Sequence, residues 1–399
     1  MKSVAHPAPA VAAEAAPEDV ARAAGRNNAL DRARTFLTIV VLIHHAVIPY
    51  TYFGHTDPTS WIGFDAIVLA TDSFFMAMFF MLSGLFVWPS LARRVTWAFT
   101  RDRALRLLVP FAIAAVTVIP IAYYAIALRQ NPTLRFTDFW WNMVTVGPWP
   151  SGPLWFTWVL FVFDFLAGFM FRVNANSLDA INRLSQRSFD RPWLFFLFLA
   201  GVTMIVYVPS RLYYGPNHWF EFGPFSVQAS RVLLYLAYFL IGAGIGAASF
   251  KTGVLSGYGR LANGGVGGWA ALAFIPYCLL WGLIYIKREL LGNPDTLPVW
   301  YEASYSVLFV IFSAAITFAI LAYFLRYKRA GRSLLDPMQH DAYGMFLVHY
   351  PFALWIQYWL YDAALPAIAK AAIGFVATLL LSWAATRLLR KIPGSERVL

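Results

Sequence analysis

The chain has 399 residues, of which 60% are hydrophobic and 13% are charged, and its formal net charge is +11. Soluble domains are about one quarter charged, so this composition excludes an ordinary soluble enzyme, a disordered chain and a fibrous repeat. A transmembrane helix needs about 20 apolar residues, so a chain of this length suits one polytopic membrane domain. The positive charge then indicates basic cytoplasmic loops rather than nucleic-acid binding.

The two ends of the chain differ from the apolar middle. Residues 1–28 are rich in Ala and Pro, and no apolar core follows a basic start, so the pattern does not match a cleaved signal peptide. We predict a disordered cytoplasmic tail over 1–28, a transmembrane domain over 29–390 and a short cytoplasmic tail over 391–399. The single cysteine, Cys278, permits no internal disulfide, and no cysteine or histidine cluster predicts a metal site.

Ten apolar runs along the chain have the length of membrane helices. They lie at about 35–53, 66–91, 105–128, 152–172, 193–209, 229–249, 266–286, 303–325, 341–359 and 366–388. The fifth run is short, and Pro89, Pro110 and Pro120 predict kinks in the second and third.

The loops between these runs predict the orientation. With both termini inside, the inside segments carry 24 Lys and Arg residues and the outside segments carry 5. This asymmetry follows the positive-inside rule, whereas an odd number of spans would place the C-terminal charges outside. We therefore predict an all-α, polytopic membrane helix bundle of about ten transmembrane helices, with both termini cytoplasmic, in the plasma (inner) membrane.

The first apolar run carries ionisable residues that are costly in lipid and often mark function. Arg34 and His45 are 11 residues apart, which on an α-helix means about 16 Å along the axis and within about 20° of one face. Both could line one channel, whereas His44 is turned about 100° away. His45 fits either a neutral imidazole bonded between helices or a group that takes and gives protons near neutral pH.

Basic residues follow the second run, and small residues lie within the second and sixth runs. Arg103 and Arg106 share a helix face, and two guanidinium groups on one face suit a polyphosphate. The alternative, which explains part of this basic segment, is that its charges set the membrane orientation and contact lipid headgroups. Ser83 and Gly84 permit close helix approach, and Ser83 lies in no GxSxG motif. The glycines at 242, 244 and 246 indicate close helix packing rather than a dinucleotide fingerprint.

Several further residues have two interpretations. Trp155 and the preceding aromatics favour an interfacial aromatic belt over a sugar-stacking platform. His349 is a second ionisable group at membrane depth, which either joins a site or only packs. Four carboxylates in or at the edges of the apolar runs fit pathway groups or helix-end caps, and the sequence does not decide between them: Asp65, Asp72, Asp164 and Glu302.

Taken together, four segments resemble the bacterial acyltransferase 3 family of integral-membrane acyltransferases, including its glucan-modifying branch. The match spans residues 30–351, nearly the whole membrane domain. The segments are Leu30-Asp31 with the Arg34–ten residues–His45 spacing, Phe79-Phe80-Met81-Leu82-Ser83-Gly84, Arg103-x-x-Arg106-Leu-x-x-Pro110, and Tyr343-Gly344-x-Phe346-Leu347-Val348-His349-Tyr350-Pro351.

The resemblance implies a ten-helix bundle that moves an acyl group from cytoplasmic acyl-CoA, such as acetyl-CoA or succinyl-CoA, to a carbohydrate or lipid-linked glycan hydroxyl. The family's first-helix histidine and arginine correspond to His45 and Arg34, and its arginine pair to Arg103 and Arg106. No esterase-like soluble domain is seen, so transfer is expected within one domain. The hypothesis is that His45 acts as general base while the arginines hold the CoA phosphates, with a covalent acyl-histidine as the variant mechanism.

Two other functions compete with this hypothesis. Intramembrane histidine, aspartate and arginine also fit a transporter of a polar or acylated solute, but the Arg34–His45 pattern has no repeat in the second half of the chain. A non-catalytic partner in polysaccharide assembly needs neither His45 nor the arginine pair. The expected partners are membrane lipids and the glycan acceptor, with no metal and no nucleic acid, and the sequence indicates no oligomeric state.

Overall fold

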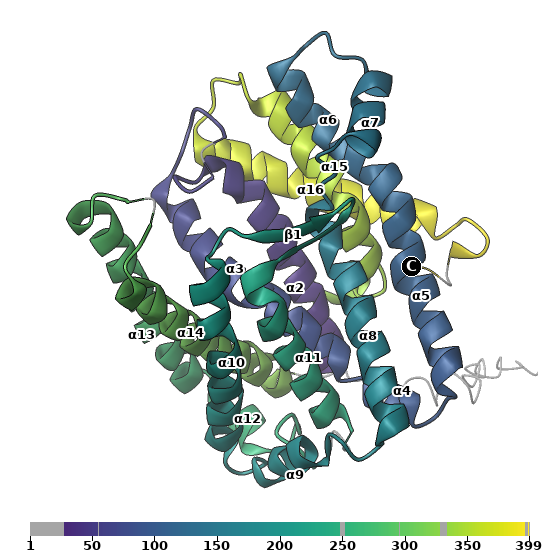
Figure 1. The fold of residues 1–399 in the computed structure, drawn as a ribbon, viewed down its shortest axis with the longest axis vertical. Helices are drawn as coiled ribbons and strands as arrows, with labels where there is room; N and C mark the ends of the chain where they lie inside the picture. The colour runs from purple at the N-terminus through teal and green to yellow at the C-terminus, as the bar shows by residue number, and fades with distance from the viewer. Residues whose placement is uncertain are drawn as a thin grey trace, which may run out of the picture.

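The computed structural model describes residues 28–54, 56–247, 252–294, 296–327, 333–395 and 398. The predicted N-terminal tail therefore lies, apart from Asn28, outside the described residues. Helices make up most of the described chain, and its only sheet is a two-stranded antiparallel hairpin (Figure 1). The longer helices are α2 (Asn28–Val47), α3 (Ile62–Gly84), α5 (Thr96–Val116), α6 (Val118–Gln130), α7 (Phe136–Thr145), α8 (Trp155–Val173), α9 (Asp179–Arg187), α10 (Pro192–Tyr214), α11 (Val232–Gly246), α13 (Val266–Tyr285), α14 (Val299–Arg326), α15 (Ala342–Leu360) and α16 (Ala367–Leu389).

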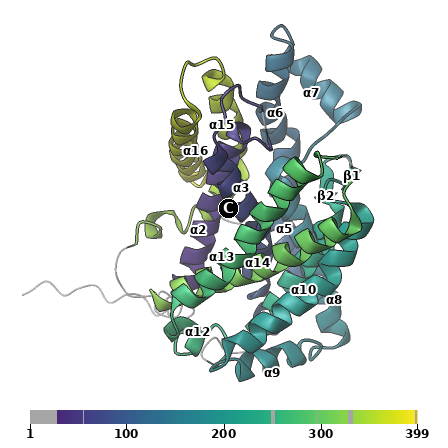
Figure 2. The ribbon, with the colours of Figure 1, turned by 90° about the vertical axis from the view of Figure 1, so that its left-hand side faces the viewer.

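The shorter elements connect these helices. They are η1 (Ile48–Tyr50), α4 (Val87–Leu91), η2 (Gly152–Leu154), β1 (Trp219–Phe222), β2 (Phe225–Gln228), η3 (Ala229–Arg231), α12 (Arg260–Asn263), the π-helical turn η4 (Ile286–Leu290) and η5 (Asp336–Met338). In both ribbon views α6 and α7 lie at one end of the molecule and α9 and α12 at the other (Figures 1 and 2).

Within the described residues, nine helical segments are long and apolar enough to cross a membrane. They are Asn28–Tyr50, Ile62–Leu91, Thr96–Gln130, Gly152–Val173, Pro192–Tyr214, Ala229–Gly246, Val266–Leu290, Val299–Arg326 and Ala367–Leu389. The chain is an all-α polytopic membrane bundle, as the composition predicted.

The tenth predicted span, α15, is absent from these nine because His349, Pro351 and Gln357 reduce its hydropathy. It nevertheless packs along α6, and its two ends contact residues in the middle of α5 and at the end of α6. Near its start the Tyr343 hydroxyl donates to the Arg106 carbonyl, and just beyond its end the Tyr361 ring lies 3.7 Å from the Arg129 guanidinium. Nineteen helical residues span about 28 Å, so α15 is long enough to cross the bundle.

Both ends of the membrane domain meet on one side of the bundle. Arg390, just after α16, donates to Asp341 ahead of α15 at 3.0 Å. Val398 lines the same cavity as Arg34 of α2. An even number of crossings accounts for this arrangement, while the assignment of that side to the cytoplasm stays a prediction from the loop charges.

The third span differs in detail from its prediction. The apolar pattern placed its start near residue 105, but α5 begins at Thr96, so the helix face predicted for Arg103 and Arg106 belongs to α5 itself. Pro110 lies inside α5 without ending it, and the break falls at Thr117, just before α6. The fifth span, predicted as short, is a 23-residue helix that extends to Tyr214. Charged residues concealed the extra turns of both helices: Arg101, Asp102 and Arg103 near the start of α5, and Arg211 near the end of α10.

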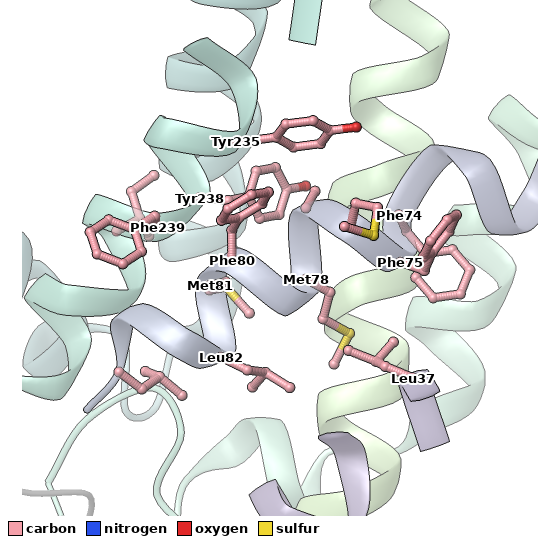
Figure 3. Packing of buried hydrophobic residues seen from close by; sticks show 14 of the residues in the cluster. Leu37, Phe74, Phe75, Met78, Phe80, Met81, Leu82, Tyr235, Tyr238 and Phe239 are labelled. Carbon is pink, nitrogen blue, oxygen red and sulfur yellow. The ribbon is translucent and has the colours of Figure 1, made fainter. Parts of the chain in front are cut away.

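The core forms around α3 and α11, which pack against each other through aromatic, methionine and leucine side chains (Figure 3). A Cβ atom on Gly84 would overlap the Phe239 carbonyl oxygen, and one on Gly242 or Gly246 would overlap the Met81 or Leu85 carbonyl oxygen. The close helix packing predicted from these glycines is confirmed. Small residues let two backbones approach in lipid, where no hydrophobic force draws helices together.

The start of α2 is fixed to the segment before α15. Arg32 donates to both carboxylate oxygens of Asp336, from Nε at 2.8 Å and from Nη2 at 2.9 Å. The hydrogen bond from this guanidinium holds the pKa of the Asp336 carboxyl below its usual value.

Candidate active site

Two cavities of the bundle contain predicted site residues in their linings, and they are named here for the predicted orientation. The outer cavity has a volume of about 420 Å³ and contains His44 and His45 in its lining. The hairpin β1–β2 and the loop 148–153 also line it, and the Ser151 and Ser226 hydroxyls join these two segments at 2.5 Å. The sequence analysis did not predict this hairpin, because its four-residue strands lie among exposed aromatic residues that read as an interfacial loop.

The His45 imidazole lies among other rings in the outer cavity. Its centroid is 5.2 Å from that of His349, 5.1 Å from that of Tyr350 and 5.5 Å from that of His44. The side-chain amide of Gln357 on α15 donates to the His45 carbonyl oxygen at 2.7 Å. This bond fixes the backbone of α2 against α15 at the level of the histidines.

Hydrogen bonds fix the proton positions on the two neighbouring histidines. The Thr71 hydroxyl donates to the Ile67 carbonyl at 2.8 Å, so His44 Nδ1 must donate to the Thr71 oxygen at 2.9 Å. His349 Nδ1 lies 2.7 Å from the Phe346 carbonyl, which only accepts, so this nitrogen also carries the proton. His349 is fully buried, and its Nε2 has no hydrogen-bond partner among the described residues.

The inner cavity has a volume of about 550 Å³ and contains Arg34, Arg103, Arg106 and Ser83 in its lining. Arg34 Nη2 donates to the Leu82 carbonyl at 2.8 Å, and its guanidinium lies 4.3 Å from the centroid of the Phe86 ring.

The two arginines of α5 face this cavity in different states. Arg103 Nε lies 3.3 Å from the carboxylate of Asp164, which is 1% exposed, so part of its charge is compensated. The Arg106 side chain is exposed, and its backbone carbonyl accepts the Tyr343 hydroxyl bond. The inner cavity therefore presents three guanidinium groups in one space, of which Arg106 is the most accessible.

The two cavities meet at Phe346 of α15, which lines both. The Phe346 ring centroid lies 6.2 Å from that of Phe79 and 5.7 Å from that of Phe156. We call these three rings the aromatic partition. Because α2 is one continuous helix, Arg34 and His45 keep the predicted spacing along its axis, but they line two different cavities rather than one channel.

The chain was compared with known proteins. The family model described as an acyltransferase domain, that of the acyltransferase 3 family, matches residues 27–387. The chain belongs to this family. Searches of curated proteins and of solved structures gave no match. The protein is therefore a multi-pass membrane acyltransferase.

The structure places all eight predicted site residues of this acyltransferase at or beside the two cavities. His44, His45 and Trp155 line the outer cavity, and Arg34, Ser83, Arg103 and Arg106 line the inner one. His349 lies outside both linings and packs against the His45 ring. His44, which is turned about 100° away from His45 on α2, also lines the outer cavity, because this cavity reaches two adjacent faces of the helix.

Trp155 was expected to belong to an aromatic belt. Its ring instead lies in the outer cavity, parallel to Tyr235 at a centroid distance of 5.4 Å and an angle of 26°. Trp141, by contrast, is 64% exposed on α7 and fits the belt.

Sequence reasoning missed one charged pair that shapes the outer cavity. Arg231 at the start of α11 donates to both carboxylate oxygens of Asp72 on α3, at 2.9 and 2.5 Å. Both residues line the outer cavity. The sequence could indicate only that Arg231, an arginine at the end of an apolar helix, needs a carboxylate nearby, and not that Asp72 supplies it.

The other carboxylates left open by the sequence also have partners in the structure. Asp164 faces Arg103, and Glu302 accepts from Arg211 at 2.7 Å. Asp65 accepts from the Phe53 backbone N–H at 3.1 Å. In the part of the chain that the structure describes, no group of three or more His, Cys, Asp or Glu side chains is arranged to hold a metal ion.

Proposed function

We propose that this acyltransferase moves an acyl group from cytoplasmic acyl-CoA to a hydroxyl of a carbohydrate or lipid-linked glycan on the opposite side of the plasma (inner) membrane. The observation that carries the proposal is the pair of cavities that meet at Phe346, one basic and the other containing His45. A basic cavity suits the phosphates of CoA, and a histidine cavity suits proton transfer. Family membership favours this function over a solute transporter.

The donor side of the proposal rests on the inner cavity. Guanidinium groups bind phosphate oxygens through paired N–H donors, and Arg103 and Arg106 present two of them from one face of α5. Arg34 adds a third guanidinium group near the C-terminal end of α3, where it donates to the Leu82 carbonyl. With the phosphates held there, the pantetheine arm extends toward Phe346 and brings the thioester to the partition.

The acid–base side rests on His45. In its neutral form the imidazole takes the proton of the acceptor hydroxyl, and the oxygen attacks the thioester carbonyl carbon. The carbon–sulfur bond then breaks, and the imidazolium returns the proton to the CoA thiolate. General base catalysis of this kind contributes about 10²- to 10⁴-fold to the rate. A covalent acyl-histidine is the variant in which the imidazole itself attacks the thioester.

The acceptor side rests on the rest of the outer cavity. Its lining combines the Trp155 ring with polar groups of the hairpin, including Glu221 and Gln228. Aromatic faces and a few polar groups are the usual composition of a small-ligand site. A glycan hydroxyl entering between the hairpin and the loop 148–153 would reach His45 from the side opposite the donor.

The test uses purified protein in nanodiscs with radiolabelled acetyl-CoA or succinyl-CoA and an extract of cell-envelope glycans. We expect CoA release and label transfer that require the extract, and we expect both to be lost in His45→Ala while expression and folding persist. Full activity of His45→Ala would exclude His45 as the base. No CoA binding and no turnover with any donor in a broad panel would overturn the proposed function.

A further inference from the structure

A third cavity, called here the side cavity, lies next to the outer cavity and has a volume of about 910 Å³. It is lined by residues of α3, α10, α13, η4 and α14 and by the loop before α3. Its size falls in the range of about 300–1,000 Å³ typical of ligand sites. Asp72 lines both this cavity and the outer one, so the two spaces adjoin at the Asp72–Arg231 pair.

Asp65 gives this cavity an unsatisfied hydrogen-bond acceptor. Its side chain is 0% exposed, and its Oδ1 accepts from the Phe53 backbone N–H. The other oxygen, Oδ2, is buried with no hydrogen-bond partner among the described residues. A buried carboxylate oxygen without a donor is strongly unfavourable, and a hydroxyl donor on a ligand would satisfy it.

The charges around the cavity favour a neutral ligand. Four carboxylates and three basic side chains line it. Arg211 is held by Glu302 at 2.7 Å, and Arg231 neutralises Asp72 from the side of the outer cavity. A phosphate or an anionic headgroup would meet the unpaired oxygen of Asp65 and be repelled. A ligand with hydroxyl donors and no charge satisfies that oxygen instead.

Aromatic rings supply the apolar part of the site. Tyr52 stands at the rim and is 52% exposed, while Trp281 and Tyr305 line the wall. The Arg211 guanidinium lies 4.3 Å from the Tyr305 ring centroid and covers one face of that ring. Rings of this kind pack against the apolar faces of sugars, as they do against other flat apolar surfaces.

We propose that the side cavity binds a neutral sugar unit of the acceptor, adjacent to the unit that receives the acyl group, with Asp65 accepting one of its hydroxyls. The acceptor is then a glycan of at least two units, which passes the Asp72–Arg231 pair and presents its reacting hydroxyl in the outer cavity. This inference rests on the proposed function for the identity of the reaction, but binding in the side cavity is measurable without it.

The first test is equilibrium binding to the purified full-length protein without acyl-CoA. The probe is a size ladder of neutral oligosaccharides, from one to about six units, released from envelope glycans by mild acid. We expect the Kd to fall about tenfold or more between one unit and the longer members, because only these reach the side cavity. No binding of any ladder member, or equal Kd values along the ladder, would overturn the inference.

Two variants with a matched control locate the effect. In Asp65→Asn the amide oxygen still accepts from Phe53, while the amide nitrogen replaces the unpartnered oxygen, so the fold is retained. We expect Asp65→Asn and Tyr52→Ala each to raise the Kd of the longer members about tenfold and to leave that of the single unit unchanged. Tyr213→Ala removes a tyrosine that is 82% exposed but outside the cavity lining, and it should change neither value.

The reaction is followed separately as acyl-CoA-dependent labelling of the same ladder. Labelling with no dependence on length or on Asp65 would overturn the side-cavity inference and leave the proposed function standing. Asp65-dependent binding without any labelling across the donor panel would overturn the proposed function and leave the side-cavity inference standing.

Discussion

The aromatic partition yields a prediction about water. Phe346 is 4% exposed and lies between the inner cavity, proposed to receive the donor thioester, and the outer cavity, proposed to receive the acceptor. Excluding water from a reactive intermediate prevents its hydrolysis. Replacing this ring by a smaller side chain, in Phe346→Leu, should therefore let the acyl-CoA be hydrolysed without any acceptor.

The magnitude follows from the contacts that Phe346 makes. It packs against two phenylalanine rings across the partition, those of Phe79 and Phe156, at 6.2 and 5.7 Å. An aromatic pair contributes about 0.5–1.5 kcal/mol beyond its buried area, so losing both weakens the closed partition by about 1–3 kcal/mol. Because leucine retains part of the apolar contact, we expect the low end, which raises the open population by about fivefold.

The matched control is Phe163→Leu. Phe163 is 3% exposed and also packs against two rings, Phe80 at 5.2 Å and Phe239 at 5.6 Å, but it lines neither cavity. Both variants should lose similar stability. The assay compares CoA release without acceptor against acyl transfer with acceptor, and we expect the ratio to rise in Phe346→Leu alone. An equal ratio in the two variants would refute the role of the partition.

Three further predictions follow from other contacts. The double variant Arg103→Ala/Arg106→Ala should raise the KM for acyl-CoA about tenfold or more with a smaller change in kcat, because phosphate contacts bind the donor before the chemical step. An unchanged KM would exclude the two arginines as ligands of the donor. Gly246→Ala should destabilise the protein by about 1–3 kcal/mol in detergent, because the added Cβ meets a backbone carbonyl that cannot rotate away. The control Gly282→Ala, with open space beside it, should be neutral or up to about 1 kcal/mol stabilising. Equal melting temperatures of the two variants would contradict this account of the α3–α11 contact. The ion pair of Asp336 with Arg32 should contribute about 1 kcal/mol or less to the free energy of unfolding at neutral pH. Because the pKa of Asp336 is lowered in the folded protein, the stability lost in Asp336→Asn should be constant above the ordinary carboxyl pKa and should vanish as the pH falls through the folded pKa. A stability difference that persists in acid would rule out the ion pair as its source.

Much of this architecture could be predicted from the sequence because lipid imposes a simple rule. Each span must satisfy its backbone internally and be apolar over about 20 residues, so hydropathy alone locates most of the helices. The rule is weakest where function requires polar residues. α15 carries His349 and Gln357, and therefore lacks the hydropathy of a span although its 19 residues are long enough to be one.

The site was predictable to the extent that it follows one helix. The spacing of Arg34 and His45 on α2 is a property of helical geometry, and so is the shared face of Arg103 and Arg106. The contact of α2 with α15, and with it the position of Phe346 between the cavities, depends on tertiary packing.

Tertiary pairing also explains what the sequence left open. Asp72 and Arg231 are 159 residues apart, and no local pattern predicts that they pair. The hairpin over the outer cavity was hidden for a similar reason, because its short strands gain their place from the helices beneath them rather than from a strand pattern.

The central claim is that donor and acceptor enter from opposite ends and meet at Phe346. The most direct measurement uses sealed proteoliposomes in which the orientation of the protein has been determined by protease accessibility of the N-terminal segment. Radiolabelled acyl-CoA is supplied on the side of the Arg103 and Arg106 cavity and glycan acceptor on the other, with His45→Gln as the inactive control. The account predicts labelled glycan only in this arrangement and only with His45. Equal labelling when both substrates are confined to either single side would contradict it.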